Sequence, residues 1–570
     1  MDLNSIKQTE TWNLYEQGVS FCRMMSMYRD TDLNYRMYNG DQWQGLKIKG
    51  VEKIQLNIIK PIIRYKTGVV LSNLYAINYS SENFESRDFR RAAAKICKLL
   101  NKKAASIWEK DYMDMKLRLV VKDAAINDMG AIYVHYSEDT GLPVNEIIDK
   151  NDIYFGNEND SDIESQPYII IKQRMSVVGA RTFAKANGVS DEELEMIMGD
   201  MDNIEEAGEA AKYEKDNMCT VLTKFYKENG TVHFSMATRT VDIKRDCDTQ
   251  LKYYPVAIIV WEEKKGSARG EGEVRQLIPN QLEINKTAMR RAITVKHTAF
   301  PQKIVNIDKI NNKDALEKSG GLIKVSGGNT TEDVSKMFAY VQPAQMSTDV
   351  EKLQNELIQT TRELAGAGDI ATGQINPESA SGRAILAVQQ ASQQPLTEHL
   401  QYTKTFVECL ARIWLDMLTV NNDNIDLEDE IKDATGEDTV QLIKVPRVVL
   451  EKLQAAVKVD ITPKGAFDKY AQEQSLENLL TGGWFSAQKI PELENYISVL
   501  EDDANMPKQK VEEMIEKFKA DQLKIAQMNA KAQMMRQRAT QFINADIDTQ
   551  AGQLLNAQRQ MQAGQLTAAQ

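Results

Sequence analysis

The chain has 570 residues, too many for one small core, so its length predicts two to four structural units. Apolar residues make up 42% and charged residues 27%, which is typical of a folded, soluble protein rather than a disordered one. The net charge of −12 argues against a protein that coats DNA with an overall basic surface, but it leaves room for one local contact with nucleic acid.

The cysteines and apolar segments argue against a secreted, zinc-binding or membrane-spanning protein. The five cysteines are scattered and form no CxxC pair, which argues against a disulfide framework or a zinc site and favours a reducing compartment. The N-terminus carries no cationic and apolar leader, so we expect no secretion signal. The most apolar segment, 253–261, is far shorter than the ~20 residues of a membrane helix, so we expect a soluble protein made inside the cell, without a membrane partner.

The N-terminal region predicts helices. Residues 11–38 have a helical apolar face, and the stretch RMYNGDQW (36–43) closes it. Asn39 and Gly40 tolerate positive φ and therefore fit a helix C-cap, although Asn-Gly is also a hairpin signal. Asn57 then fits as the N-cap of a further helix.

The next two hundred residues predict a long helix followed by a β-rich section. Apolar residues at 3–4 spacing indicate a helix from Asp88 to about Met129, ended by Gly130. Residues 131–148 read as two strands with a turn at 139–141. Further segments complete the section: a strand at 168–175, an acidic helical insert at 191–215, and strands at 220–230, 231–239 and 253–261.

From Lys264 the pattern predicts two helices joined by short elements. A Gly-rich start leads into a helix of roughly 25 residues that ends near Pro301. Short strands and a short helix occupy 302–343, and a second helix spans 346–365 with a capping box at Thr348 and Glu351. This second helix has a near-heptad stripe that requires a partner helix: Met346, Val350, Leu353, Leu357, Thr361 and Leu364.

The remaining residues predict a polar loop and further helices. Residues 365–382 contain few large apolar side chains, and such a long loop is a functional candidate. Helical patterns follow at 383–394 and 396–420, then an acidic linker at 421–438 and a strand-like segment at 448–463. The C-terminal part is helical, and its Gln- and Ala-rich end either frays or packs with other copies into a bundle.

Motifs of known enzyme classes are missing from the sequence. GxxxxGK[ST], GxSxG and HExxH do not occur, and the glycines of 366–373 follow a helix instead of the strand that a nucleotide-binding loop needs. The four histidines lie far apart in sequence, and the acidic run 157–164 lacks the glycine and final glutamate of an EF-hand. We therefore expect a protein that is not an enzyme and binds neither cofactor nor metal.

A basic segment and the polar loop are the candidate DNA-contacting parts. Residues 264–303 hold nine Lys or Arg against three Glu, and Lys286, Arg290, Thr294 and His297 follow one helical stripe. In a monomer this stripe is a solvent-exposed helix face. In a ring of subunits it is repeated around the axis as a band of positive charge, which contacts DNA phosphates without recognising bases. The loop offers neutral hydrogen-bonding side chains past which DNA can slide, namely Thr372, Gln374, Asn376, Ser379 and Ser381. A flexible linker between two helices explains the same composition equally well.

Six sequence motifs occur along the chain in the same order as in a known protein family. They are RMYNGDQW with LNIIKPII (56–63), AINDMGAIYVHY (125–136), DIYFGNENDSDIESQPYIIIKQRMS (152–176), GEGEVRQLIPNQLEIN (270–285) and the Gly-Asp-Ile…Ser-Gly-Arg-Ala run (368–384). In this order the chain resembles the portal proteins of tailed double-stranded DNA bacteriophages over nearly its whole length. The insert at 191–215 has no counterpart in that pattern.

The resemblance implies an α+β portal-type subunit. Its parts would be an α/β wing (1–262 and 383–465, the second part holding the tunnel helix and strands), an antiparallel two-helix stem (263–299 and 346–365), a small α/β clip (300–345), a tunnel loop (366–382) and an all-helical crown or barrel (466–570). The stem helices would pair through Leu277, Leu282, Met289, Ile293, Val350, Leu353, Leu357 and Leu364. Tyr38, Gly40 and Trp43 would anchor the first helix on the wing.

The resemblance also implies partners and a place of action. We expect a ring, a dodecamer by family analogy, at one capsid vertex of the virion, assembled in the host cytoplasm. Double-stranded DNA would pass through it without sequence recognition, beside Lys286, Arg290, Arg291, Lys296 and His297 of the stem and beside the tunnel loop with Asp369. Terminase, a head-completion or adaptor protein at the clip, and the major capsid and scaffold proteins around the wing would be partners. A packaging-associated nuclease using the 157–164 carboxylates and a helical scaffold protein are the alternatives.

Overall fold

The computed structural model describes most of the chain. The described residues are 8–43, 53–72, 74–80, 87–200, 217–299, 303–305, 311–312, 314, 324, 326, 338–340, 349–368, 394–432, 438–456, 458–464, 476–482, 484, 489–491, 493 and 508–567. They form a mixed helix-and-sheet protein, which confirms the predicted α+β class in its general form. The chain divides into two compact units, Met1–Pro463 and Lys464–Gln570.

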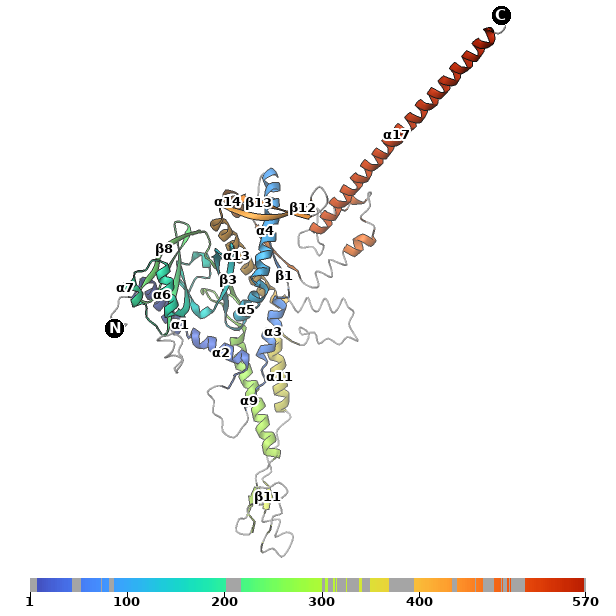
Figure 1. The fold of residues 1–570 in the computed structure, drawn as a ribbon. Helices are drawn as coiled ribbons and strands as arrows, with labels where there is room; N and C mark the ends of the chain where they lie inside the picture. Colours follow the sequence, from blue (N-terminus) through green and yellow to red (C-terminus); the bar gives the residue numbers. More distant parts are fainter. Residues whose placement is uncertain are drawn as a thin grey trace. The chain divides into compact units, whose positions relative to one another are not determined.

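Two sheets of unit 1 organise its β-rich section (Figure 1). The three-stranded sheet has the order β3-β2-β9 and the five-stranded sheet the order β4-β5-β6-β7-β8, with every pair antiparallel. The strands are β2 (Met129–Ser137), β3 (Leu142–Ile148), β4 (Ile153–Phe155), β5 (Tyr168–Ser176), β6 (Met218–Glu228), β7 (Thr231–Ala237), β8 (Asp242–Leu251) and β9 (Val256–Val260).

Helices cover these sheets, and most of them share one large apolar core with the strands, while two smaller apolar clusters hold the others. α13 (Thr397–Asn421) contacts β9, β2 and β3, and it buries Phe406, Leu410 and Trp414. The other helices of this region are α1 (Glu10–Met24), α2 (Met27–Asn39), α3 (Ile59–Val70), α4 (Arg87–Lys110), α5 (Met113–Ile126), α6 (Val177–Ala186) and α7 (Asp191–Met196). Short 3-10 turns lie at Lys150–Asp152 (η2), Ile163–Ser165 (η3) and Gln394–Leu396 (η6).

Three small two-stranded sheets and two long helices complete unit 1. The paired strands are β1 with β14, β10 with β11, and β12 with β13. Their bounds are Leu74–Ser80 (β1), Lys458–Lys464 (β14), Lys303–Val305 (β10), Phe338–Tyr340 (β11), Asn424–Lys432 (β12) and Asp438–Pro446 (β13). The helices are α9 (Glu273–Ala299) and α11 (Asp349–Leu364), with the shorter α14 (Arg447–Ala456) following β13.

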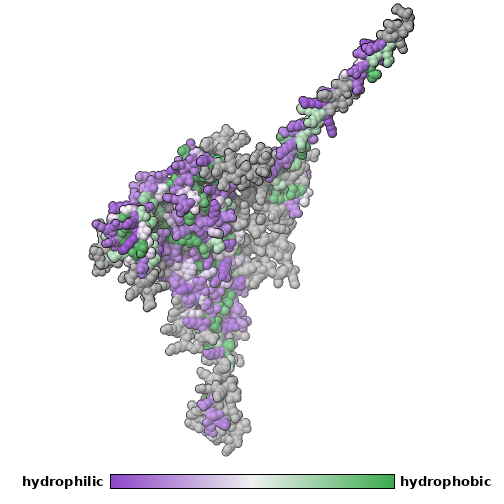
Figure 2. Space-filling view, in the orientation of Figure 1, coloured by the Kyte–Doolittle hydropathy of each residue, from purple (hydrophilic) through white to green (hydrophobic). Residues whose placement is uncertain are grey.

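Unit 2 contains the longest helix, α17 (Lys508–Thr567). Its first turns bury Val511 and Ile515 against a small apolar cluster with Leu479, Ile490 and Leu493. Beyond them Figure 2 shows hydrophobic residues interspersed with hydrophilic ones along the helix. The large apolar side chains whose exposure the structure describes in this stretch are more than half exposed: Leu523, Ile525, Met528, Met534, Met535, Leu554, Leu555 and Met561.

Several predicted elements differ from the structure. The helix predicted over 11–38 is two helices, because Ser26 between them takes the left-handed conformation (φ 57°). The helix predicted over 88–129 breaks at Tyr112 (φ 51°), and its last residues begin β2. The acidic linker predicted at 421–438 contains β12, and most of the strand-like segment 448–463 is the helix α14, followed by β14.

Candidate functional site

The clearest candidate site is the pair formed by α9 and α11, which lie side by side in Figure 1. Near the start of α9, Asn280 donates a hydrogen bond to the Thr361 hydroxyl (3.2 Å). Eleven residues further along α9, Arg291 donates to Gln354 (2.7 Å). Because the partner number falls while the α9 number rises, the two helices are antiparallel. At 1.5 Å per residue, α9 is about 40 Å long.

A buried cluster of three amides, Gln42, Gln281 and Asn285, fixes α9 to the N-terminal region; we call it the amide lock. Gln281 and Asn285 are 0% exposed and lie one helical turn apart on α9. Gln281 accepts a hydrogen bond from the Ile58 amide (2.9 Å) and donates to the Leu56 carbonyl (2.7 Å). Asn285 accepts from the Leu56 amide (3.0 Å) and donates to the Gln42 side chain.

The stretch 36–43 leads directly into this lock. α2 ends at Gly40, whose φ of 98° suits glycine, and a Cβ there would lie 2.5 Å from the Gln55 side chain. The Lys60 and Lys122 ammonium groups both lie over the buried Tyr38 ring, at 5.5 and 5.3 Å from its centroid.

Trp43 and Gln42 continue the same turn. The Trp43 indole donates to the Ile54 carbonyl (3.0 Å), and Gln42 donates to the Met37 carbonyl (3.0 Å). The residues predicted as a wing anchor therefore contact the segment 53–60 and Lys122, and Gln42, which the sequence analysis did not single out, makes the hydrogen bond to α9.

The start of α9 is packed without spare room. A Cβ on Gly272 would lie 2.0 Å from the Asn127 carbonyl oxygen, so only glycine fits there. Before it, the buried Arg269 guanidinium pairs with Glu158 (3.0 Å) and donates to the Lys150 and Ile153 carbonyls. Burial lowers the pKa of Arg269, but the nearby Glu158 carboxylate outweighs this and leaves it raised, so the guanidinium stays charged.

The first turn of α9 carries a second buried ion pair. Glu273 pairs with Lys66 of α3 (2.7 Å) and accepts a hydrogen bond from the Trp261 indole (3.3 Å). His399, at the start of α13, packs on the same indole with ring centroids 4.2 Å apart. Burial and the Lys66 charge together lower the pKa of His399. A charged histidine is therefore disfavoured beside this pair.

The predicted basic stripe divides into two groups. Lys286 and Arg290 are exposed and share one carboxylate, Glu283, at 3.8 and 3.0 Å. Arg291 points instead toward α11, where it also lies 3.5 Å from Glu351. Lys296 is exposed, and the side chain of His297 lies outside the described residues. The structure therefore assigns Arg291 to the contact between the two helices and leaves Lys286 and Arg290 at the surface.

The predicted apolar pairing of the two helices differs from the contacts that form. Leu277 is buried, but Leu353 and Leu364 are 51% and 79% exposed. The face of α9 that meets α11 contains Asn280, Thr287 and Arg291, and Leu282, Met289 and Ile293 fall on the opposite side at 100° per residue. Val350 and Leu357 are half-buried at the flank of α11. Polar residues therefore hold the pair together, and the heptad-like stripe lies largely beside the contact.

The acidic run 157–164 does not form a cation site among the described residues. Glu158 is bound to Arg269, and Glu164 pairs with Lys227 (2.6 Å). Asp160 accepts from Ser165 (2.7 Å), and Asp162 caps the 3-10 turn η3. Because each carboxylate has an internal partner, the run acts as a folded loop, and its carboxylates do not converge on one point.

The predicted tunnel loop lies largely outside the described residues. α11 ends at Leu364, and the description continues only to Gly368 before resuming at residue 394. The loop candidates Asp369, Thr372, Gln374, Asn376, Ser379 and Ser381 all fall in the gap. Among the described residues, no helix is both long and apolar enough to span a lipid bilayer.

Comparison with known proteins gives one family. The family described as phage P22-like portal protein matches residues 21–570, nearly the whole chain, whereas no curated protein matches. The matched region includes the amide lock, the α9–α11 pair and α17. The chain therefore belongs to the phage P22-like portal protein family.

Proposed function

We propose that this chain is the subunit of a ring through which a phage genome is packaged and later ejected. Family membership supports a portal role, a homo-oligomeric ring and a place at the capsid vertex. The observation that carries the proposal is the match over residues 21–570, together with the antiparallel α9–α11 pair. A subunit count of twelve is part of the proposal.

The parts of the subunit follow from the same family pattern. We assign the wing to 1–262 and 383–465, the stem to 263–299 and 346–365, the clip to 300–345, the tunnel loop to 366–382 and the crown to 466–570. The antiparallel helices support the stem, and the β10–β11 pair between them in sequence supports the clip. The end of unit 1 at Pro463 supports a separate crown.

The described surface of α9 supports weak contact between DNA and the channel. Lys286 and Arg290 carry two positive charges against the single negative charge of Glu283, so each copy leaves a surplus of about one charge there. A ring repeats this surplus around its axis, which attracts phosphates without base recognition. The neutral groups of the tunnel loop would add contacts that do not hold DNA in place.

The partners are proposed at separate parts of the subunit. Terminase supplies the energy for packaging, and this fits a chain without a phosphate-binding loop motif. A head-completion or adaptor protein would bind the clip, and the major capsid and scaffold proteins would surround the wing. Assembly would take place in the host cytoplasm.

Negative-stain electron microscopy of the purified protein tests the proposal. We expect closed rings with a central hole wide enough for duplex DNA. Monomers or open filaments at all salt and protein concentrations would overturn it. Linear DNA incubated with Mg²⁺ or Mn²⁺ should remain intact, since the carboxylates of 157–164 are held by internal partners. Cleavage that disappears when Asp160 is replaced would favour the nuclease alternative.

A further inference from the structure

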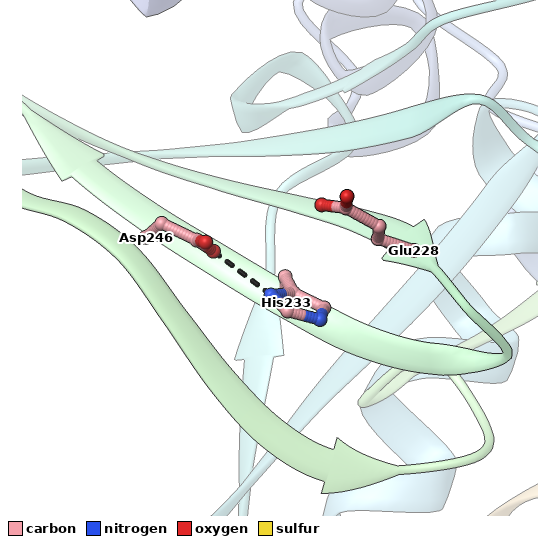
Figure 3. Close-up of side chains that lie close together, drawn as sticks. All are labelled: Glu228, His233 and Asp246. Carbon is pink, nitrogen blue, oxygen red and sulfur yellow. Dashed lines mark hydrogen bonds and ion pairs between the residues drawn. The ribbon is translucent and has the colours of Figure 1, made fainter.

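Three side chains on neighbouring strands of the five-stranded sheet bring metal-binding atoms together, well away in sequence from the α9–α11 pair. They are Glu228 at the end of β6, His233 on β7 and Asp246 on β8 (Figure 3). One donor atom from each lies within 4.8 Å of the other two. The His233 Nδ1 and a carboxylate oxygen of Asp246 are 2.8 Å apart.

The hairpin geometry explains why these residues meet. Asn229 and Gly230 take positive φ (52° and 88°), which makes a tight turn that directly joins β6 to β7. Tyr226 pairs with His233 across the ladder, and Glu228 lies two residues along on the same face. His233 also pairs with Asp248, which places Asp246, two residues away, on this face as well.

A second layer of contacts orients two of the three donors. The Tyr226 hydroxyl donates to Asp246 (2.7 Å), and its ring stacks on the His233 imidazole at 5.7 Å. The His233 side chain is only 13% exposed, so its ring is held in the sheet surface. Glu228 is exposed, and its carboxylate accepts no hydrogen bond from a described residue. It is therefore free to turn toward a ligand.

We propose that Glu228, His233 and Asp246 bind one divalent transition-metal ion of the Zn²⁺ type, with water completing the coordination. One imidazole and two carboxylates are suitable ligands for such an ion. Three ligands at about 2.1 Å in a tetrahedral site lie about 3.4 Å apart, so the donors need only small side-chain adjustments. The ion takes the place of the proton between His233 Nδ1 and Asp246: a neutral imidazole then carries its proton on Nε2, and a charged imidazole releases one proton to solvent.

The local charge favours a cation. Three carboxylates, including Asp248 at 3.9 Å from His233 Nε2, surround one imidazole. Two lysines of these strands lie over aromatic rings: Lys224 over Tyr226 and Lys244 over Phe234. The competing explanation is a simple His–Asp ion pair, which needs no metal and makes no use of Glu228.

Titration calorimetry of the full-length protein with Zn²⁺ separates the two explanations. We expect one site per chain that weakens at least about tenfold in Glu228→Gln and His233→Ala. Glu228→Gln is the sharper variant, because this exposed side chain is not needed for folding. Asp242→Asn, an exposed carboxylate on β8, is the matched control and should bind Zn²⁺ as the wild type does.

Zinc also binds thiolates, and the chain has five cysteines. The proposal is therefore judged by the difference in Zn²⁺ affinity between the wild type and each variant. Mg²⁺ titrated in parallel should show no dependence on His233, since imidazole is a poor ligand for it. Unchanged Zn²⁺ affinity in both Glu228→Gln and His233→Ala would overturn the proposal. So would an affinity that falls only in His233→Ala, because Glu228 would then not be a ligand of the ion.

Discussion

Asn285 shows how one side chain positions a whole helix. It is 0% exposed and connects α9 to Gln42 and to the backbone at Leu56. Replacing it by alanine removes these bonds, leaves the buried Gln42 side-chain oxygen without its donor and leaves the partly buried Leu56 amide without its acceptor. Since a buried unsatisfied polar group costs about 1–3 kcal/mol, Asn285→Ala should destabilise unit 1 by about 2–4 kcal/mol.

Thermal unfolding followed by calorimetry measures this effect, because the two units can give separate transitions. Asn355→Ala is the control, since Asn355 is an exposed asparagine on α11. An equal, small effect of both substitutions would mean that the amide lock contributes little to holding α9.

Arg290 and Arg291 are adjacent in sequence but differ in their surroundings. Arg291 is 30% exposed and bound to Gln354 and Glu351 of α11, whereas Arg290 is 64% exposed. Arg291→Glu should therefore lower the unfolding temperature of unit 1, because it places like charges together between the helices. Arg290→Glu should leave stability unchanged and reduce the salt-dependent binding of DNA to assembled rings.

Differential scanning calorimetry and a DNA-binding titration at two salt concentrations measure both effects. The two variants serve as controls for each other, because the charge change is identical. If Arg290→Glu lost stability as much as Arg291→Glu, the division of the basic stripe into two groups would be wrong.

His399 gives unit 1 an acid-sensitive point. Burial and the Lys66 charge lower its pKa below 6.5, against the opposing effects of Glu273 and Glu398. The folded state therefore keeps the imidazole neutral, while the unfolded chain binds a proton below about pH 6.5. The neutral His399 therefore contributes fully to the stability of unit 1 above about pH 6.5. This contribution is lost as the pH falls toward the lower pKa that His399 has in the folded state.

His399→Phe keeps an aromatic ring against Trp261 and removes the titration. Between pH 7.5 and 5.5, the unfolding temperature of unit 1 should fall less in this variant than in the wild type. Equal falls in the two proteins would show that other groups cause the acid sensitivity.

At the scale of elements, local patterns predicted most of the structure. The hairpin over 131–148 was readable because alternating apolar residues flank a turn with Gly141, which has positive φ. The two helices at 273–299 and 349–364 were readable from their 3.6-residue periodicity. β8 was missed because its burial alternates poorly and charged residues occupy half of its ten positions, as suits an edge strand.

The site was harder to predict than the elements. Gln281 and Asn285 lie four residues apart on a face that also buries Ile284 and Ala288, and polar residues there look like part of a solvated face. Their partners are at Gln42, Leu56 and Ile58, more than 220 residues away. These groups come together only in the folded chain. The spacing of apolar residues in the sequence therefore predicts the helix α9 but not the amide lock.

Shortening the tunnel loop tests whether ring assembly and DNA packaging depend on different parts of the chain. Asn280 and Arg291 of α9 bond directly to Thr361 and Gln354 of α11, so we expect the helix pair to form without the loop. Deleting residues 372–376 should leave ring formation intact and lower the amount of DNA retained per particle. A variant of full length with Gly and Ser at these positions is the control for loop length. Normal packaging by the deletion variant would exclude the loop from the mechanism.

At the scale of the whole molecule, the question is which part assembles the ring. α17 is about 90 Å long, and beyond Phe518 the large apolar side chains that the structure describes are exposed in the single chain. A helix with so little to bury gains stability from other copies, which fits a barrel of neighbouring subunits. Yet the family match includes the α9–α11 pair of unit 1, where a ring contact can form without α17.

Truncation after Phe518 tests this directly, because it keeps Val511 and Ile515 in the core of unit 2 and removes only the exposed helix. We expect the truncated chain still to form rings, seen by electron microscopy and by mass photometry. A truncation after Pro507 is the comparison: it also removes the core residues and should destabilise unit 2. If the chain ending at Phe518 stayed monomeric while remaining folded, α17 would be the assembly element, and the helical-scaffold alternative would replace the portal ring formed by unit 1.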